Sequence, residues 1–211
     1  MSVAHKLHDV LAKLRRASEK VGRNPEQVSI VAASKKQPIE LMLEYMEAAQ
    51  AARVSCIFGE NYVQEMKAKR IALNSSVDFH LLGPIQSNKI KEAVRYADII
   101  ESIHSMSVLD GVAREADRQG KRQQILLQIN VGNDPQKSGF RVSDARDVVC
   151  RALSYSSTLS VVGLMTITPL YDKPEMARED FRLMNDLRAQ LAKEIPELQH
   201  NGNRFVLSMG M

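Results

Sequence analysis

The 211-residue sequence contains no tryptophan, only five phenylalanines and five tyrosines, and only two cysteines. So few aromatic side chains argue against a platform on which nucleic-acid bases stack. The basic segments at 67–70 (KAKR) and 120–124 (GKRQQ) lack the interleaved aromatics of a nucleic-acid-binding module. Cys56 and Cys150 lie far apart and indicate no disulfide framework. We therefore predict a cytoplasmic protein with no nucleic-acid partner and no metal site.

Long hydrophobic runs are also absent. No segment approaches the roughly 18 uncharged apolar residues of a membrane span, so no association with a membrane is predicted. The N-terminal stretch MSVAHKLHDVLAKLRRASEKVG is amphipathic and carries acids within its basic face, which favours a helix over a signal peptide. The net charge of +4 is a mild excess that a solvated surface explains. No linker rich in proline, glycine or serine divides the chain, and we predict one domain over residues 1–211.

Two kinds of segment alternate along the rest of the chain. Short runs rich in β-branched residues predict strands at 28–33, 56–58, 79–82, 99–103, 125–131, 159–167 and 205–209. Segments with helical spacing predict helices at 39–52, 62–73, 88–97, 108–119, 144–153 and 175–195. Strands that alternate with helices through short connections form parallel, right-handed crossovers.

Two folds fit this alternation, a doubly wound open sheet and a TIM-type (β/α)8 barrel. The first strand–helix turn, SKKQP, lacks the glycine fingerprint of a dinucleotide-binding domain. Gln128 and Asn130 place polar side chains on one face of a predicted strand. Chemically capable residues also recur at the C-terminal ends of several strands, where barrels build their sites. We therefore predict an α/β fold of the TIM-type (β/α)8 barrel class, with an extra N-terminal helix.

The segment SIVAASKKQP at 29–38 ends a predicted strand on two lysines. Strand residues alternate between faces, so Lys35 shares a face with Ala33, whereas the bulkier Ile30 points to the other side. If the face with Ile30 packs on helices, Lys35 lies at the mouth of the barrel. A neutral lysine amine in such a place can attack an aldehyde and form a Schiff base. The alternative is that Lys35 is an ordinary solvated surface lysine.

Five segments on other strands, taken together with the Lys35 segment itself, bear on this choice. They are VAASKKQP (31–38), FGENYVQE (58–65), FHLLGPIQSNK (79–89), QKSGF (136–140), VGLMTI (162–167) and LSMGM (207–211). Together, in this order and spacing, they closely resemble the pyridoxal-phosphate homeostasis protein family. That family consists of single-domain proteins with the barrel of the alanine racemase N-terminal domain, and the resemblance covers nearly the whole chain.

The resemblance implies a set of residues that bind pyridoxal 5'-phosphate (PLP). Lys35 would carry the cofactor covalently, as an internal aldimine. Asn61 would lie beside it at the barrel mouth, and His80 would approach the ring or the phosphate. Met165 would pack on the pyridine ring, and Ser208 of LSMGM completes the predicted cofactor-binding residues. The resemblance assigns no catalytic residue.

Several of these residues also have an ordinary structural explanation. Asn61 could be the N-cap of the helix that follows it, His80 an interior histidine with satisfied hydrogen bonds, and Met165 a core residue. The family places a second lysine at Lys137, as a possible alternate amine. For Lys137 we favour a surface role.

In the family, the SMGM segment is followed by a serine, a helix and an eighth strand with an Arg-Ile-Gly stretch. The sequence stops at Met211, so we predict a barrel that lacks the last helix and the eighth strand. The loops after strands seven and eight of a barrel commonly bind phosphate. We therefore expect a natural polypeptide longer than this chain, and a cofactor that binds weakly or is absent where those loops are missing.

The function implied by the resemblance is that of a monomeric PLP-binding protein in intracellular PLP homeostasis. Such a protein stores or buffers the cofactor, or delivers it to apo-enzymes that depend on PLP. The alternative is a PLP-dependent enzyme such as a weak amino-acid racemase. Racemisation needs a second acid/base on the opposite face of the cofactor, which alanine racemases take from a separate β domain. We therefore predict a protein that is not an enzyme.

Overall fold

A computed structural model describes residues 2–74, 77–132, 134, 137–169, 171–198 and 205–210. Gln136 of the QKSGF segment and Met211 of LSMGM lie outside the described residues. The chain divides into two compact units, Met1–His80 and Leu81–Met211, and each is considered by itself.

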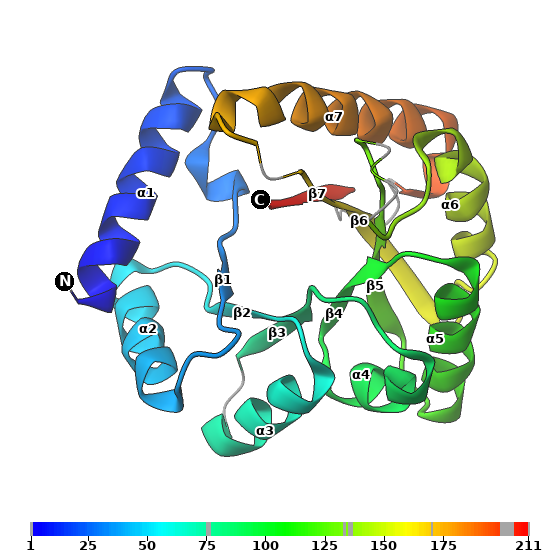
Figure 1. Cartoon of the computed structure of the whole chain (residues 1–211), viewed down its shortest axis with the longest axis horizontal. Helices are drawn as coiled ribbons and strands as arrows, with labels where there is room; N and C mark the ends of the chain where they lie inside the picture. The colour runs from blue at the N-terminus through cyan, green and yellow to red at the C-terminus, as the bar shows by residue number, and fades with distance from the viewer. Residues whose placement is uncertain are drawn as a thin grey trace. The chain divides into compact units, whose positions relative to one another are not determined.

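Helices and strands alternate along the chain, with seven of each among the described residues (Figure 1). The helices are α1 (Val3–Glu19), α2 (Ile39–Ala52), α3 (Val63–Leu73), α4 (Ile90–Tyr96), α5 (Met106–Arg118), α6 (Ala145–Leu153) and α7 (Ala177–Glu194). The strands are β1 (Val31–Ala33), β2 (Ile57–Glu60), β3 (Asp78–Leu81), β4 (Ile99–Ile103), β5 (Gln123–Gln128), β6 (Leu159–Ile167) and β7 (Val206–Gly210). No described helix is both long enough and apolar enough to cross a bilayer.

In the first unit, β1 runs parallel to β2, and α1 packs against α2 (Figure 1). Leu7 of α1 forms a buried cluster with Ala48 and Ala49 of α2, and Ile30 packs against this cluster. Ile30 therefore faces the helices, which confirms the predicted orientation of that residue. The opposite side of β1 is left for residues that do not pack on helices.

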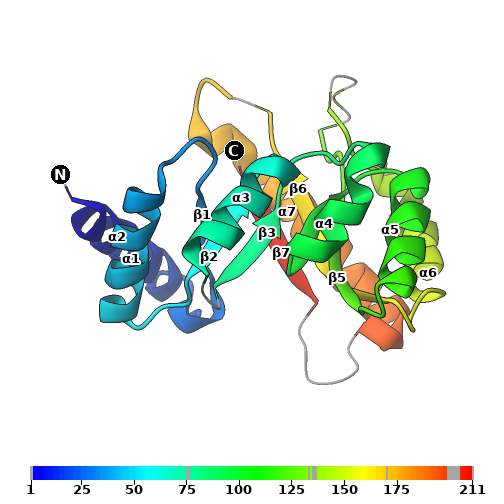
Figure 2. The same cartoon turned by 90° about the horizontal axis from the view of Figure 1, so that it is seen from below.

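In the second unit, β4, β5, β6 and β7 pair in parallel, each with the next. Helices α4 and α5 lie side by side along these strands (Figures 1 and 2). Gly163 allows β6 and β7 to approach closely, because a Cβ atom at this position would collide with the carbonyl oxygen of Val206. This close approach fixes the register in which Gly163 pairs with Val206 and Met165 with Ser208.

The strands differ from the sequence prediction mainly at their ends. The predicted strand 28–33 is shortened to β1, because the Val28 N–H closes the 3-10 turn η1 (Pro25–Gln27) by donating to the Pro25 carbonyl. The predicted strand 125–131 begins earlier and ends at Gln128 as β5. Beyond it, Ile129 forms an isolated bridge with Phe140.

Two helices begin later than predicted. The 3-10 turns η2 (Ser87–Lys89) and η3 (Val142–Asp144) occupy the starts of the predicted helices 88–97 and 144–153, so α4 begins at Ile90 and α6 at Ala145. A further 3-10 turn, η4 (Pro174–Met176), begins with a proline and precedes α7. Parallel strands that alternate with helices confirm the predicted α/β class.

Candidate functional site

Lys35 lies in the turn that follows β1, and its side chain is exposed. Within the described part of the chain, the Lys35 side chain forms no hydrogen bond or ion pair. The amine is thus open to a reagent from solvent. Because β1 already ends at Ala33, the alternation of strand faces does not extend to Lys35, and the direction of its side chain stays a prediction.

The residue after Lys35 has an unusual backbone conformation. Lys36 has a φ of 58°, in the left-handed region. That conformation costs an L-residue roughly 1–2 kcal/mol. Lys36 therefore needs other interactions to hold it there, and its backbone N–H donates a 2.6 Å hydrogen bond to Glu65 Oε1.

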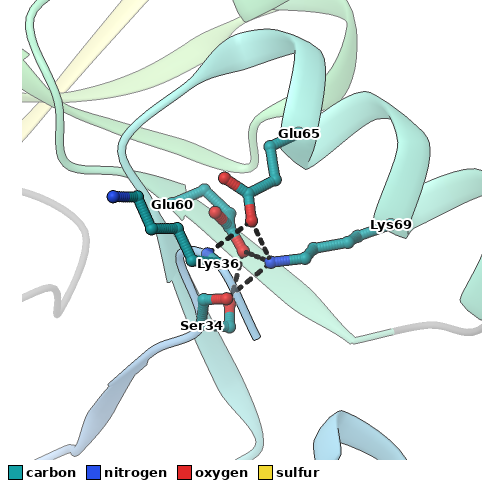
Figure 3. A network of polar contacts seen from close by, with 5 residues as sticks. All are labelled: Ser34, Lys36, Glu60, Glu65 and Lys69. Atoms are coloured by element: carbon teal, nitrogen blue, oxygen red, sulfur yellow. Dashed lines mark hydrogen bonds and ion pairs between the residues drawn. The ribbon is translucent and has the colours of Figure 1, made fainter. Parts of the chain in front are cut away.

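This bond belongs to a polar network between the turn, the end of β2 and helix α3 (Figure 3). The Ser34 hydroxyl donates to Glu60 Oε1 at 2.6 Å. The Lys69 ammonium lies at the centre of the network. It donates to the Ser34 carbonyl oxygen at 2.5 Å and to Glu60 Oε1 and Glu65 Oε1 at 2.7 Å each. Of the two neighbours of Lys35 in the chain, Ser34 is therefore bonded to both β2 and α3, and Lys36 is bonded to α3.

The network is largely removed from water. The side chain of Glu60 is 0% exposed, that of Lys69 is 8% exposed and that of Glu65 is 24% exposed. Partial burial opposes ionisation of Glu65, but hydrogen bonds from Lys69 and from the Lys36 backbone outweigh it and lower the pKa of the Glu65 carboxyl. The second oxygen of Glu60, Oε2, is buried and has no hydrogen-bond partner among the described residues. A buried carboxylate in this state depends on the ammonium beside it.

Local sequence explains how α3 contributes to the network. Glu65 and Lys69 are four residues apart and therefore lie on the same face of the helix. Sequence reasoning assigned no role to either residue. The spacing of Glu65 and Lys69 was visible, but an exposed ion pair on a helix has the same spacing.

Asn61 lies at the same edge of the first unit as Lys35. Ala33 of β1 pairs with Gly59 of β2. Lys35 follows Ala33 by two positions, and Asn61 follows Gly59 by two positions. The N-cap of α3 is Tyr62, so the alternative of Asn61 as the N-cap is wrong. Asn61 is partly exposed, which leaves its amide available at this edge.

The other predicted site residues lie in β3, β6 and β7. His80 is buried in β3, with an exposed fraction of 8%. In the second unit, Met165 of β6 pairs with Ser208 of β7, so the two residues are neighbours across the sheet. Met165 is buried, as a core residue would be, and Ser208 is partly exposed.

The Lys137 side chain is hydrogen-bonded to the backbone at the end of β6. Its ammonium donates to the carbonyl oxygens of Thr168 at 2.6 Å and of Ile167 at 3.3 Å. In this arrangement Lys137 holds the segment after β6 in place. Lys35 thus differs from Lys137, because the Lys35 amine has no partner in the part of the chain that the structure describes. Among the described residues, no group of three or more His, Cys, Asp or Glu side chains could hold a metal ion.

Comparison with known proteins identifies the family to which this chain is similar. The sequence profile of the alanine racemase N-terminal domain matches residues 6–203. The pyridoxal phosphate homeostasis protein of Aquifex aeolicus is 30% identical over 212 aligned residues, which cover 100% of this chain and 88% of the relative. The protein of the same name from Vibrio alginolyticus is 29% identical, with 100% and 87% covered.

Solved structures that resemble this chain include PipY and an alanine racemase. PipY of Synechococcus elongatus PCC7942, solved without PLP, has a TM-score of 0.77 at 27% identity and covers 93% of this chain and 97% of PipY. PipY with PLP bound has a TM-score of 0.73 at 28% identity, with 95% and 97% covered. An alanine racemase of Clostridium difficile, at 12% identity, covers 95% of this chain and 50% of the racemase with a TM-score of 0.66, and so shares the fold alone. These likenesses confirm the predicted fold of the TIM-barrel type. The chain belongs to the pyridoxal phosphate homeostasis protein family and has the fold of the alanine racemase N-terminal domain.

Proposed function

We propose that this protein binds pyridoxal 5'-phosphate as a Schiff base on Lys35 and takes part in intracellular homeostasis of the cofactor. The observation that carries the proposal is the exposed amine of Lys35, which has no hydrogen-bond or ion-pair partner among the described residues and whose two neighbours in the chain are held by polar groups of the network. The relatives' shared name, and the PLP bound to PipY, support the choice of cofactor.

The residues present fit the chemistry of this cofactor. PLP carries an aldehyde, and a primary amine condenses with an aldehyde by forming a C=N bond and releasing the carbonyl oxygen as one water molecule. Lys35 supplies such an amine, and its side chain forms no ion pair with any residue in the described ranges. Asn61, at the same strand edge, offers an amide for hydrogen bonds to the polar substituents of the ring. We keep His80, Met165 and Ser208 as further predicted contacts of the cofactor.

We infer a carrier rather than an enzyme. The relatives are named for homeostasis, which supports storage or delivery of the cofactor. Racemisation needs an acid/base group on each face of the cofactor, and Lys35 supplies only one. We propose that the protein acts in the cytoplasm as a monomer and that apo-enzymes receive the cofactor. Incubation with L-alanine or L-serine and PLP in deuterated water tests this: a carrier leaves the α-proton in place, and rapid exchange would instead indicate a racemase-like enzyme.

A visible absorbance titration with PLP tests the attachment point. We expect the wild-type protein to develop the visible band of a protonated Schiff base, and the Lys35→Ala variant to lack it. Lys36→Ala is the matched control, because it removes the neighbouring amine but retains the backbone N–H that Glu65 accepts. A band that survives in Lys35→Ala, or disappears in Lys36→Ala alone, would contradict the assignment.

A further inference from the structure

We propose that Glu60, Glu65 and Lys69 are positioning residues that hold the amine of Lys35 where it can condense with an aldehyde. This inference rests on the proposed function, and it assigns to the three residues a role that their burial alone does not require. None of them is proposed to touch the cofactor. They act through the backbone on either side of Lys35.

The first support is that the network restrains both neighbours of Lys35. On the N-terminal side, the Ser34 carbonyl oxygen accepts from Lys69, and the Ser34 hydroxyl donates to Glu60. On the C-terminal side, the Lys36 N–H donates to Glu65. The backbone of Lys35 thus lies between two anchored residues, so that little more than the side-chain torsions of Lys35 remains to be fixed when the amine reacts.

The second support is the strained conformation of Lys36. A lysine with φ of 58° is disfavoured, and such strain persists only where the surroundings impose it. The bond from the Lys36 N–H to Glu65 is a hydrogen bond to a carboxylate, which is stronger than one between neutral groups. Glu65 therefore stabilises the strained conformation of Lys36 directly. A turn that needed only to connect β1 to α2 could relax without this bond.

The third support is the position of Lys69. Its ammonium is buried and donates to three acceptors, on β2, on α3 and on the turn. A lysine buried merely to neutralise Glu60 would not need the bond to the Ser34 carbonyl. That bond joins the charged pair to the residue directly before Lys35, which makes the ion pair part of the support for the amine.

Stopped-flow absorbance measurement of Schiff-base formation tests the inference. The observed rate is followed against PLP concentration, which separates the plateau rate of condensation from the concentration at half saturation. We expect Glu65→Ala to lower the plateau rate about tenfold, which corresponds to about 1.4 kcal/mol, with little change in half saturation. A change confined to the plateau indicates lost positioning, whereas general loosening of the fold would weaken binding as well.

Glu179→Ala is the matched control. Glu179 is the third residue of α7, as Glu65 is the third residue of α3, and it is exposed at that position. Its removal should leave the plateau rate unchanged. If Glu65→Ala does not fold, as judged by circular dichroism, Glu65→Gln takes its place, because glutamine retains an acceptor oxygen but not the charge. We then expect a plateau rate lowered about threefold, since a neutral acceptor binds the N–H more weakly.

The two proposals fail in different ways. If Lys35→Ala forms the same visible band as the wild type, the proposed attachment at Lys35 is wrong. If Lys35 is required but folded Glu65→Ala, or its glutamine substitute, condenses at the wild-type plateau rate, only the positioning role is wrong.

Discussion

The ion pair of Lys69 and Glu60 provides the most demanding test of the polar network in Figure 3. Lys69→Met retains an unbranched, apolar side chain of similar length and removes the ammonium. Of the hydrogen bonds that the described residues make to Glu60, whose side chain is 0% exposed, the variant leaves one, from Ser34 to Oε1, and none to Oε2. The carboxylate would then be buried without a compensating cation.

The expected cost follows from this burial. Removing one partner of a buried ion pair typically destabilises a protein by about 3–5 kcal/mol. Glu65, at 24% exposed, loses a hydrogen bond in the same variant, but water can replace part of it. We therefore expect Lys69→Met to lower the free energy of unfolding by about 3 kcal/mol. Arg178→Met is the control, because the pair of Arg178 with Glu175 is exposed at 59% and 77% and should be worth less than about 1 kcal/mol.

Urea denaturation followed by circular dichroism measures both variants, and a double variant identifies the cause. Lys69→Met combined with Glu60→Gln removes the stranded charge, so it should be more stable than Lys69→Met alone by about 1 kcal/mol. Two results would refute the reasoning: a loss below about 1 kcal/mol in Lys69→Met, or a double variant that is no more stable than that single one.

Two further predictions concern packing and pH. Gly163→Ala places a methyl group against the carbonyl oxygen of Val206 and should destabilise the fold by about 3 kcal/mol or more. The control is Gly111→Ala, whose new methyl group meets the flexible end of Ile90 and should cost less than about 1 kcal/mol. If thermal denaturation shows similar losses for the two variants, the close approach of β6 to β7 is contradicted. The pKa of the Glu65 carboxyl is lowered in the folded protein, so the charge of Glu65 stabilises the fold at pH values above 4.5, the ordinary pKa of a glutamate. This advantage over Glu65→Gln is lost as the pH falls through the lowered pKa. Urea denaturation at pH 7 and at about pH 3 should show a larger difference between wild type and variant at pH 7, and an equal difference would mean that the carboxylate charge plays no part.

Much of the framework could be predicted because its signals are local. The predicted segments 39–52, 99–103 and 159–167 coincide with α2, β4 and β6. In each case a run of suitable residues is bounded by turn-forming or polar ones, such as Pro38 before α2. Where a 3-10 turn intervenes, as in η2 (Ser87–Lys89), the predicted helix 88–97 lies in the right region but starts too early, because the first turn is tighter than an α-helix.

The candidate site was predictable only in part. Lys35 and Asn61 follow paired strands, so their shared edge follows from the parallel arrangement of β1 and β2. The polar network of Ser34, Glu60, Glu65 and Lys69 could not be predicted from strand pairing. Ser34, Glu60 and Lys69 come from three separate elements, and nothing in the local sequence distinguishes a buried lysine from one on the surface of a helix.

Chemical location of the cofactor tests the central claim most directly. The protein loaded with PLP is reduced with borohydride, which converts a Schiff base into a stable secondary amine, and its peptides are mapped by mass spectrometry. We predict a single major pyridoxyl adduct on Lys35, with Lys36 and Lys137 unmodified. An adduct on either of those two lysines in place of Lys35, or no adduct on any lysine, would contradict the account.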